Sequence, residues 1–110
     1  MNILENYKNT DCCLTLTNGQ KIVCHLGYNV EENRYTVKYS CEVVYVPVEG
    51  GMAPVLQPWQ PFIKENEVII DRSSITSVGS MADEMKSIWK KTTGQVDIFT
   101  PPDPKIELVN

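Results

Sequence analysis

Alanine is almost absent from this chain: it occurs twice in 110 residues, at Ala53 and Ala82. Valine, isoleucine, threonine and tyrosine together account for 34 residues. Because alanine is the best helix former, whereas β-branched and aromatic residues favour strands, this imbalance excludes a helix bundle. We therefore predict a mostly β protein, and the length of 110 residues suits a single domain.

The chain also lacks an excess of positive charge and a long apolar run. Its 10 Lys and Arg residues face 14 Asp and Glu residues, which gives a net charge of −4. This balance argues against duplex DNA as a partner, whereas single-stranded nucleic acid can be bound through stacking and a local patch. No apolar run approaches the roughly 20 residues that span a membrane. Residues 1–10 lack the features of a signal peptide, so we expect no membrane partner and a cytoplasmic protein.

The four cysteines include no CxxC pair. Cys12 and Cys13 are adjacent, so on a strand they point to opposite faces and cannot both ligate one metal without distortion. We interpret the cysteines as reduced, small apolar side chains. A zinc site built from Cys24, His25 and Cys41, or a redox role, is the alternative. The main prediction is that the protein holds no metal and no cofactor.

Catalytic motifs are missing as well. The sequence holds no GxSxG, HExxH, Walker or GxGxxG motif, and His25 is its single histidine. A nucleophile and base pair would need that histidine, and no nearby serine or cysteine stands out as its partner. We predict that the protein is not an enzyme.

Period-two alternation of apolar residues predicts five strands. They cover residues 12–17, 22–28, 35–45, 62–71 and 75–78. The dipeptide Asn18-Gly19, whose residues both accept positive φ, joins the first two strands as a hairpin. Near Val44 the third strand becomes apolar on both faces, and Pro47 is expected to end it. Four prolines in residues 47–61 then predict a long irregular loop.

Two helices are predicted at the ends of this β region. Residues 2–9 have apolar residues at helical spacing, and Asn2 is their expected cap. Ser80 is the expected N-cap of a second helix, which Gly94 ends. The apolar stripe of that helix contains Met81, Met85, Ile88 and Trp89. Residues 95–110 are expected to form an extended tail, with an added strand at residues 105–109.

Two segments resemble the two motifs of the Sm-like (LSm, Hfq-type) family. The first has an apolar strand ending in Asn18-Gly19, a second strand, and then Asn29 and Asn33 four residues apart. The second covers residues 67–78, where a strand ends in a polar turn and one short strand follows at once. The resemblance covers residues 2–79. The acidic balance, the extended middle loop and the added C-terminal helix are similar to Sm-like proteins encoded by bacterial viruses, and would place the protein in the host cytoplasm.

This resemblance implies a five-stranded, strongly bent SH3-like barrel of the Sm type over residues 1–79. A short helix (2–9) precedes the barrel, residues 47–61 form its variable loop, and residues 80–110 add a C-terminal helix and an extended tail. In Sm-like rings the fourth strand of one subunit pairs with the fifth strand of the next, which covers two open edges. The residues expected at this contact are Val68, Ile69, Ile70, Ile75, Thr76 and Val78. The implied homo-oligomer has about five to seven subunits, with a pentamer or hexamer favoured. The alternative is a monomer in which both are ordinary core strands.

The resemblance also implies binding of single-stranded RNA at the inner rim of the ring. The positions that match the family's RNA-binding turns are Asn29, Glu31, Asn33, Asp71, Arg72 and Ser73. Glu31 departs from the family pattern, because it stands where a base-stacking residue is common and has no π-face. Asp71 stands where the family commonly has arginine. These residues could instead be ordinary turn residues, and the protein could be a viral structural or assembly protein that uses the barrel only for protein contacts.

Overall fold

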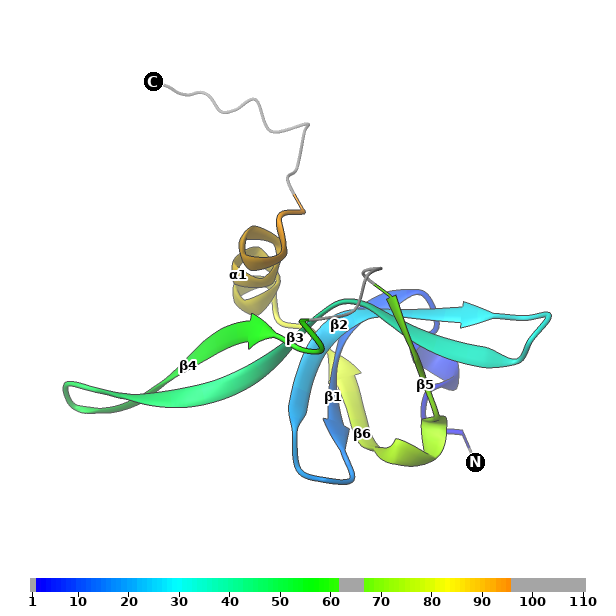
Figure 1. Cartoon of the computed structure of the whole chain (residues 1–110), viewed down its shortest axis with the longest axis horizontal. Helices are drawn as coiled ribbons and strands as arrows, with labels where there is room; N and C mark the ends of the chain where they lie inside the picture. Colours follow the sequence, from blue (N-terminus) through cyan, green and yellow to red (C-terminus); the bar gives the residue numbers. More distant parts are fainter. Residues whose placement is uncertain (1, 62–66, 96–110) are drawn as a thin grey trace, which may run out of the picture.

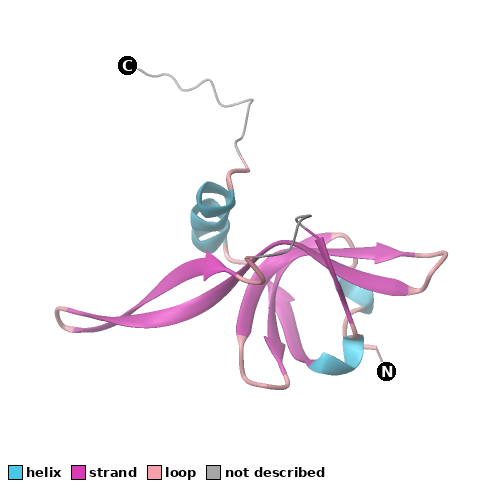
Figure 2. Cartoon of the chain, viewed as in Figure 1, coloured by secondary structure: helices cyan, strands magenta, loops and turns pink. Residues whose placement is uncertain are grey.

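The computed structural model describes residues 2–61 and 67–95, and shows a single antiparallel sheet of six strands with one α-helix (Figures 1 and 2). The strands are β1 (Thr10–Leu16), β2 (Lys21–Asn29), β3 (Arg34–Val48), β4 (Gly51–Pro58), β5 (Glu67–Ile70) and β6 (Ile75–Ser80). The helical segments are two short 3-10 turns, η1 (Glu5–Tyr7) and η2 (Arg72–Ser74), and the helix α1 (Asp83–Thr93). The mostly β prediction is confirmed.

The sheet has the order β4-β3-β2-β1-β6, and β5 also pairs with β3. Within residues 2–61 and 67–95 the sheet does not close, because β6 pairs only with β1, and β4 and β5 pair only with β3. The sheet contains one strand more than the five that the sequence predicts. The additional strand is β4, which lies inside the segment expected to be an irregular loop.

The hairpin of β1 and β2 follows the predicted alternation, and its turn differs in detail. Of the two turn residues, only Gly19 has a positive φ, of 91°. The main-chain N–H of Leu16 donates to the carbonyl oxygen of Gln20 at 2.8 Å, which leaves a three-residue loop between the strands. A type I turn followed by glycine in the left-handed region is the usual geometry of such a loop. Asn18 stabilises the turn through its side chain, whose Oδ1 accepts from the Gln20 N–H at 2.9 Å.

The expected loop over residues 47–61 is wrong for most of its length. β3 continues through Pro47 to Val48, and β4 pairs with it from Val48↔Gly51 to Cys41↔Pro58. Prolines are tolerated here because this hairpin is open on both sides: the pairing of β2 with β3 stops at Glu42, and β4 has no other described partner. A proline whose missing N–H would face an open edge removes no ladder hydrogen bond.

A bend at Tyr39 divides β3 into two parts. Tyr39 has φ of 53°, a left-handed conformation that is uncommon for a residue with a side chain. Before the bend, β3 pairs with β2 along one edge and with β5 along the other. After the bend, β4 pairs with that second edge in place of β5. Figure 1 shows the hairpin of β3 and β4 extending away from the rest of the sheet. The bend therefore points this hairpin outwards.

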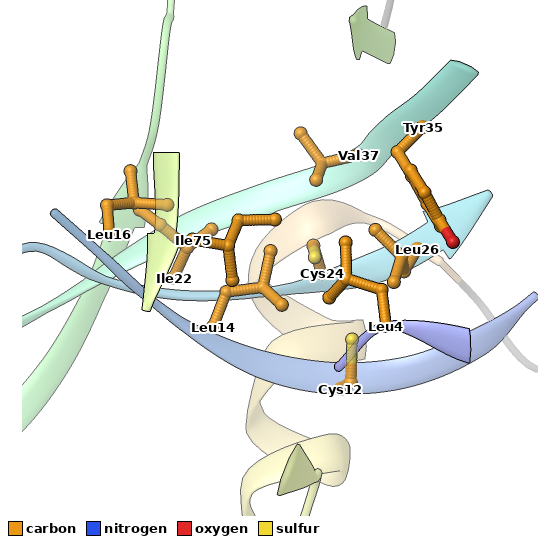
Figure 3. Close-up of a cluster of buried hydrophobic side chains, with 10 residues drawn as sticks. All are labelled: Leu4, Cys12, Leu14, Leu16, Ile22, Cys24, Leu26, Tyr35, Val37 and Ile75. Carbon is orange, nitrogen blue, oxygen red and sulfur yellow. The ribbon is translucent and has the colours of Figure 1, made fainter. Parts of the chain in front are cut away.

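Two hydrophobic clusters lie on opposite faces of the sheet. The inner cluster consists of Leu4, Cys12, Leu14, Leu16, Ile22, Cys24, Leu26, Tyr35, Val37 and Ile75 (Figure 3). The outer cluster consists of Val23, Cys41, Met81 and Trp89, with Cys13, Tyr39, Val43, Leu56 and Met85 packed against it. Cys12 and Cys13 belong to different clusters, which confirms that these neighbours point to opposite faces.

Both predicted helices need correction. The N-terminal helix expected over residues 2–9 is a single 3-10 turn, because the N–H of Asn9, at φ 60°, already donates to Leu26 at 2.7 Å. Asn2 still accepts from the N–H of Leu4 at 3.0 Å, as a cap does. In α1 the N-cap is Ala82, not Ser80, which is still paired with β1.

Other features of α1 follow the prediction more closely. Gly94 ends the helix with φ of 76°, as expected. Met81, Met85 and Trp89 pack in the outer cluster, but Ile88 is half exposed and lies outside it. The expected strand over residues 62–71 is described only as β5, since residues 62–66 lie outside the described residues. The expected tail from residue 96 and the strand at 105–109 also lie outside them.

Candidate functional site

The two turns that the resemblance assigns to RNA binding lie next to each other. The turn after β2 leads into β3 at Arg34, and η2 follows the end of β5 at Ile70. Since Tyr35 and Ile70 are register partners, both turns emerge at the same end of the β3 and β5 pair. They enclose a hollow of about 270 Å³. Its lining residues are Asn33, Arg34, Tyr35, Ile69, Ile70, Asp71 and Arg72.

Asn33 is held rigidly at the edge of this hollow. It has φ of 52°, and its Oδ1 accepts from the hydroxyl of Tyr28 at 2.5 Å. Its main-chain N–H donates to the carbonyl oxygen of Val30 at 3.3 Å. Its side-chain NH₂ group makes no hydrogen bond within the described residues. This group is a donor that could read an acceptor atom on a base edge.

Asp71 caps η2, which fixes the second turn. Its Oδ1 accepts from the N–H of Ser73 at 3.0 Å, and its carbonyl oxygen accepts from the hydroxyl of Ser74 at 2.6 Å. The hydrogen bond from the Ser73 N–H holds the pKa of Asp71 below its ordinary value, and the nearby Arg72 charge lowers the pKa further. Asp71 is therefore ionised at neutral pH and serves mainly to shape the turn.

Arg72 is the cation of the site. It lines the hollow beside Asn33 and also a second hollow of about 520 Å³ on the other side of η2. Ser73 lines this second hollow, together with residues of the N-terminal turn. Arg72 forms no ion pair within residues 2–61 and 67–95, whereas Arg34 is paired with Glu32 at 3.4 Å. The guanidinium of Arg72 is thus available for a phosphate or a base edge.

Asn29 and Glu31 do not join this arrangement. Asn29 does not line the hollow of Asn33 and Arg72, but an adjoining hollow of about 510 Å³ that shares Arg34 and Ile69 with it. Its Oδ1 accepts from the N–H of Glu32 at 3.0 Å, which is the role of an ordinary turn residue. Glu31 is exposed and does not line any of these three hollows. Asn33 therefore lines one hollow with Arg72, whereas Asn29 lines the adjoining one.

Two tyrosines that belong to neither sequence motif support the site. Tyr28 and Tyr35 are register partners on either side of the turn, with ring centroids 4.8 Å apart. The ammonium of Lys8 lies 4.0 Å from the centre of the Tyr28 ring, and the side-chain amide of Asn2 donates to the Tyr35 hydroxyl at 2.9 Å. The sequence does contain a signal for this pair, because Tyr28 and Tyr35 lie at equal distances from the centre of the polar turn between them.

The strands on either side of η2 each have one unpaired edge among the described residues. β5 pairs only with β3, and β6 pairs only with β1. In these strands Val68, Ile70 and Val78 pack against the inner cluster, Ile75 is buried within it, and Ile69 points outwards with 60% of its surface exposed. Thr76 is the extra residue of a bulge, and its hydroxyl donates to the carbonyl oxygen of Thr15 at 3.0 Å. All six residues expected at the subunit contact therefore lie on these two edge strands.

The alternative zinc site is not assembled. Cys24 lies in the inner cluster and Cys41 in the outer cluster, so the sheet separates them. Contact with the Cys12 thiol and burial raise the pKa of Cys24, and burial raises the pKa of Cys41, so both remain neutral thiols. His25 instead places Nδ1 2.9 Å from Asp11. Among the described residues, no three potential metal ligands gather, and no helix is long and apolar enough to cross a bilayer.

Comparison of the sequence with models of known protein families found no match, and comparison with curated proteins found none either. The resemblance to Sm-like proteins therefore stays a prediction.

Proposed function

We propose that this protein assembles into a homo-oligomeric ring of the Sm type and binds single-stranded RNA at the inner rim. One observation carries the proposal: Asn33 and Arg72, taken from two separate motifs of the sequence, line the same hollow. An unbonded amide donor beside an unpaired guanidinium suits a nucleotide, whose base edge accepts hydrogen bonds and whose phosphate is negative. Of the other matched positions, Asn29, Asp71 and Ser73 shape the two turns through hydrogen bonds to the main chain.

The open edges of β5 and β6 support the assembly. Unpaired strand edges promote association unless something covers or disrupts them. The β4 edge carries Pro54 and Pro58, which hinder the addition of a further strand, whereas β5 and β6 contain no proline. In the proposed ring, β5 of one subunit pairs with β6 of the next, and each strongly bent sheet forms an SH3-like barrel. The number of subunits is about five to seven, with five or six favoured.

A titration of the assembled protein tests the proposal. We expect light scattering to give the mass of a ring, and fluorescence anisotropy to detect binding of labelled U-rich or A-rich oligonucleotides. Binding should weaken as salt increases, because phosphate contacts release counterions. The double variant Asn33→Ala with Arg72→Ala should lose about tenfold or more in affinity, since it removes a base contact and a phosphate contact. Lys21→Ala removes an exposed cation at the opposite end of β2 and should bind as the wild type does.

A second candidate is a viral structural or assembly protein that uses the same ring for protein contacts alone. The net charge of −4 and the exposed Glu31 at the stacking position favour this reading. The two candidates differ in one measurement. Rings that form normally but show no salt-dependent affinity for either oligonucleotide would reject RNA binding and leave the assembly role, and a wild-type monomer would reject both.

A further inference from the structure

The hollow of about 510 Å³ that Asn29 lines lies on the face of β2, β3 and β5 opposite the inner cluster, and we call it the outer hollow. α1 packs on the same face at the outer cluster, and none of the residues described for α1 lines the hollow. Its volume suits a small ligand, since such sites usually measure about 300–1,000 Å³. The lining residues that matter here are His25, Gly27, Thr36, Lys38, Glu67 and Ile69.

The imidazole of His25 is held in a fixed orientation beside the outer hollow. Its Nδ1 lies 2.9 Å from Oδ1 of Asp11, and Oδ2 of Asp11 lies 3.8 Å from the ammonium of Lys86. Because a carboxylate accepts hydrogen bonds, Nδ1 carries the proton of the neutral ring and Nε2 keeps a free lone pair. His25 lines the hollow and Asp11 does not. Nε2 is therefore an oriented acceptor for a ligand hydroxyl.

Lys38 supplies positive charge beside this acceptor. Its side chain is exposed and forms no ion pair within residues 2–61 and 67–95. In the register of the sheet, Lys38 lies between His25 on β2 and Glu67 on β5. Thr36, two residues away on the same face of β3, also lines the hollow. An ammonium and a hydroxyl suit a phosphate, and an acceptor on each side of Lys38 suits hydroxyl groups next to that phosphate.

The floor of the outer hollow is apolar at its centre. Gly27 has no side chain, and an added Cβ would lie 2.9 Å from Oγ1 of Thr36. Ile69, the register partner of Thr36 on β5, is 60% exposed. Arg34 also lines the hollow, but it is already paired with Glu32 at 3.4 Å. Among the described residues, the hollow thus combines one unpaired cation, two acceptors and an apolar surface.

We propose that the outer hollow binds a sugar phosphate. The phosphate contacts Lys38 and Thr36, and the sugar hydroxyls donate to Nε2 of His25 and to the carboxylate of Glu67. The carbon atoms of the sugar ring lie on Ile69. A simple anion would leave both acceptors without a donor, and an uncharged sugar would leave Lys38 without a partner. This chemistry has two sources, a free sugar phosphate and the ribose phosphate of an RNA chain. The site requires neither the ring nor the hollow of the two turns, so it stands apart from the proposed function.

Isothermal titration calorimetry of the full chain with ribose 5-phosphate tests this inference. Inorganic phosphate is the matched probe without a sugar, and it should bind about tenfold more weakly because the hydroxyl contacts are missing. Lys38→Ala should lose about tenfold or more in affinity for ribose 5-phosphate, since a charge-assisted contact is removed. Lys90→Ala is the matched control, because it removes an exposed cation of α1. It should bind as the wild type does.

His25→Asn tests the role of the imidazole. The asparagine amide places an NH₂ group where Nδ1 stood, so the bond to Asp11 is kept and only the outer nitrogen is lost. This variant should bind ribose 5-phosphate about as weakly as the wild type binds inorganic phosphate, and its affinity for inorganic phosphate should not change. A loss of affinity for both probes would show that His25 acts only on the structure, and would contradict the assigned contact.

A U-rich oligoribonucleotide distinguishes the two sources. If only the oligonucleotide binds, and Lys38→Ala and His25→Asn both weaken its binding, the site stands with the RNA chain as its ligand. The inference is overturned if neither variant changes the binding of either probe, or if the wild type binds inorganic phosphate as tightly as ribose 5-phosphate. The double variant Asn33→Ala with Arg72→Ala should keep the wild-type affinity for ribose 5-phosphate, so failure of the proposed RNA site leaves this result intact.

Discussion

The indole N–H of Trp89 donates to the main-chain carbonyl oxygen of Tyr39 over 2.6 Å. This bond ties α1 to the point where β3 bends. Tyr39 has a left-handed backbone conformation at the bend, and Trp89 is fully buried against it. The only α-helix of the described residues therefore stabilises the direction in which the β3 and β4 hairpin leaves the sheet.

Trp89→Phe should destabilise the protein by about 1–3 kcal/mol, because it leaves the Tyr39 carbonyl without its buried donor while keeping most of the apolar bulk. Urea unfolding of the wild type and the variant measures this difference. Ile88→Ala is the control from the same helix, since Ile88 is half exposed. It should change stability by no more than about 0.5 kcal/mol. Equal effects of the two substitutions would argue against the hydrogen bond as a stabilising contact.

Gly27→Ala should also be destabilising, because an added Cβ would lie 2.9 Å from Oγ1 of its cross-strand partner Thr36. We expect a cost of about 1–3 kcal/mol from this overpacking. Thr36→Ala removes the oxygen and should recover most of that cost in the double variant, which a double-mutant cycle detects. Gly79→Ala is the control, since nothing lies within 4 Å of its added Cβ. Strictly additive effects at positions 27 and 36 would contradict the contact.

The carboxyl group of Asp71 should titrate below its ordinary pKa of 3.8, because the Ser73 N–H stabilises the ionised form. A lowered pKa in the folded state means that the bond contributes stability above the unfolded pKa, and that this contribution is lost as the pH falls through the folded pKa. Carbon-detected NMR of the protein between pH 6 and 2 follows the titration. A peptide of residues 67–78 is the unfolded reference, and an identical midpoint in peptide and protein would refute the prediction.

Replacing Pro54 and Pro58 with valine should open the β4 edge to further strands. Each substitution restores a main-chain N–H on a strand that has no outer partner within the described residues. We expect concentration-dependent growth well beyond the wild-type mass, because an unprotected apolar edge templates pairing with other chains. Light scattering over a dilution series measures it. Pro61→Val, outside β4, should keep the wild-type mass. A doubly substituted protein that also keeps this mass would show that the prolines do not guard the edge.

The sequence predicted those parts of the fold in which a local pattern reports burial. In the β1 and β2 hairpin every second residue enters the inner cluster, so period-two alternation identified both strands. β4 was missed because prolines usually indicate a loop. Whether a strand tolerates proline depends on which of its edges stays unpaired, and the pairing of the whole sheet decides this. The left-handed conformation of Tyr39 has no local signal, since tyrosine rarely adopts it. The helix cap is Ala82 and not the predicted Ser80, because Ser80 is still paired with β1 as the last residue of β6.

The candidate site was predictable only in part, because local patterns mark its turns but do not show which turns come together. Asn33 and Arg72 belong to polar turns that the sequence marks clearly, but their common hollow depends on β5 pairing with the first part of β3. Asn29 matched the motif equally well, yet its side chain caps its own turn. Whether a turn amide faces a ligand or its own backbone is decided by a hydrogen bond that motif spacing does not encode.

In the outer part of the β3 and β4 hairpin (residues 43–56) the two strands pair only with each other, since the pairing of β2 with β3 ends at Glu42. Residues can therefore be added to or removed from its tip, in matched pairs, without shifting any strand of the main sheet. The tip of the hairpin can therefore change its length in evolution while the sheet that carries the two turns stays the same. It also offers a practical place to graft a foreign peptide or a label.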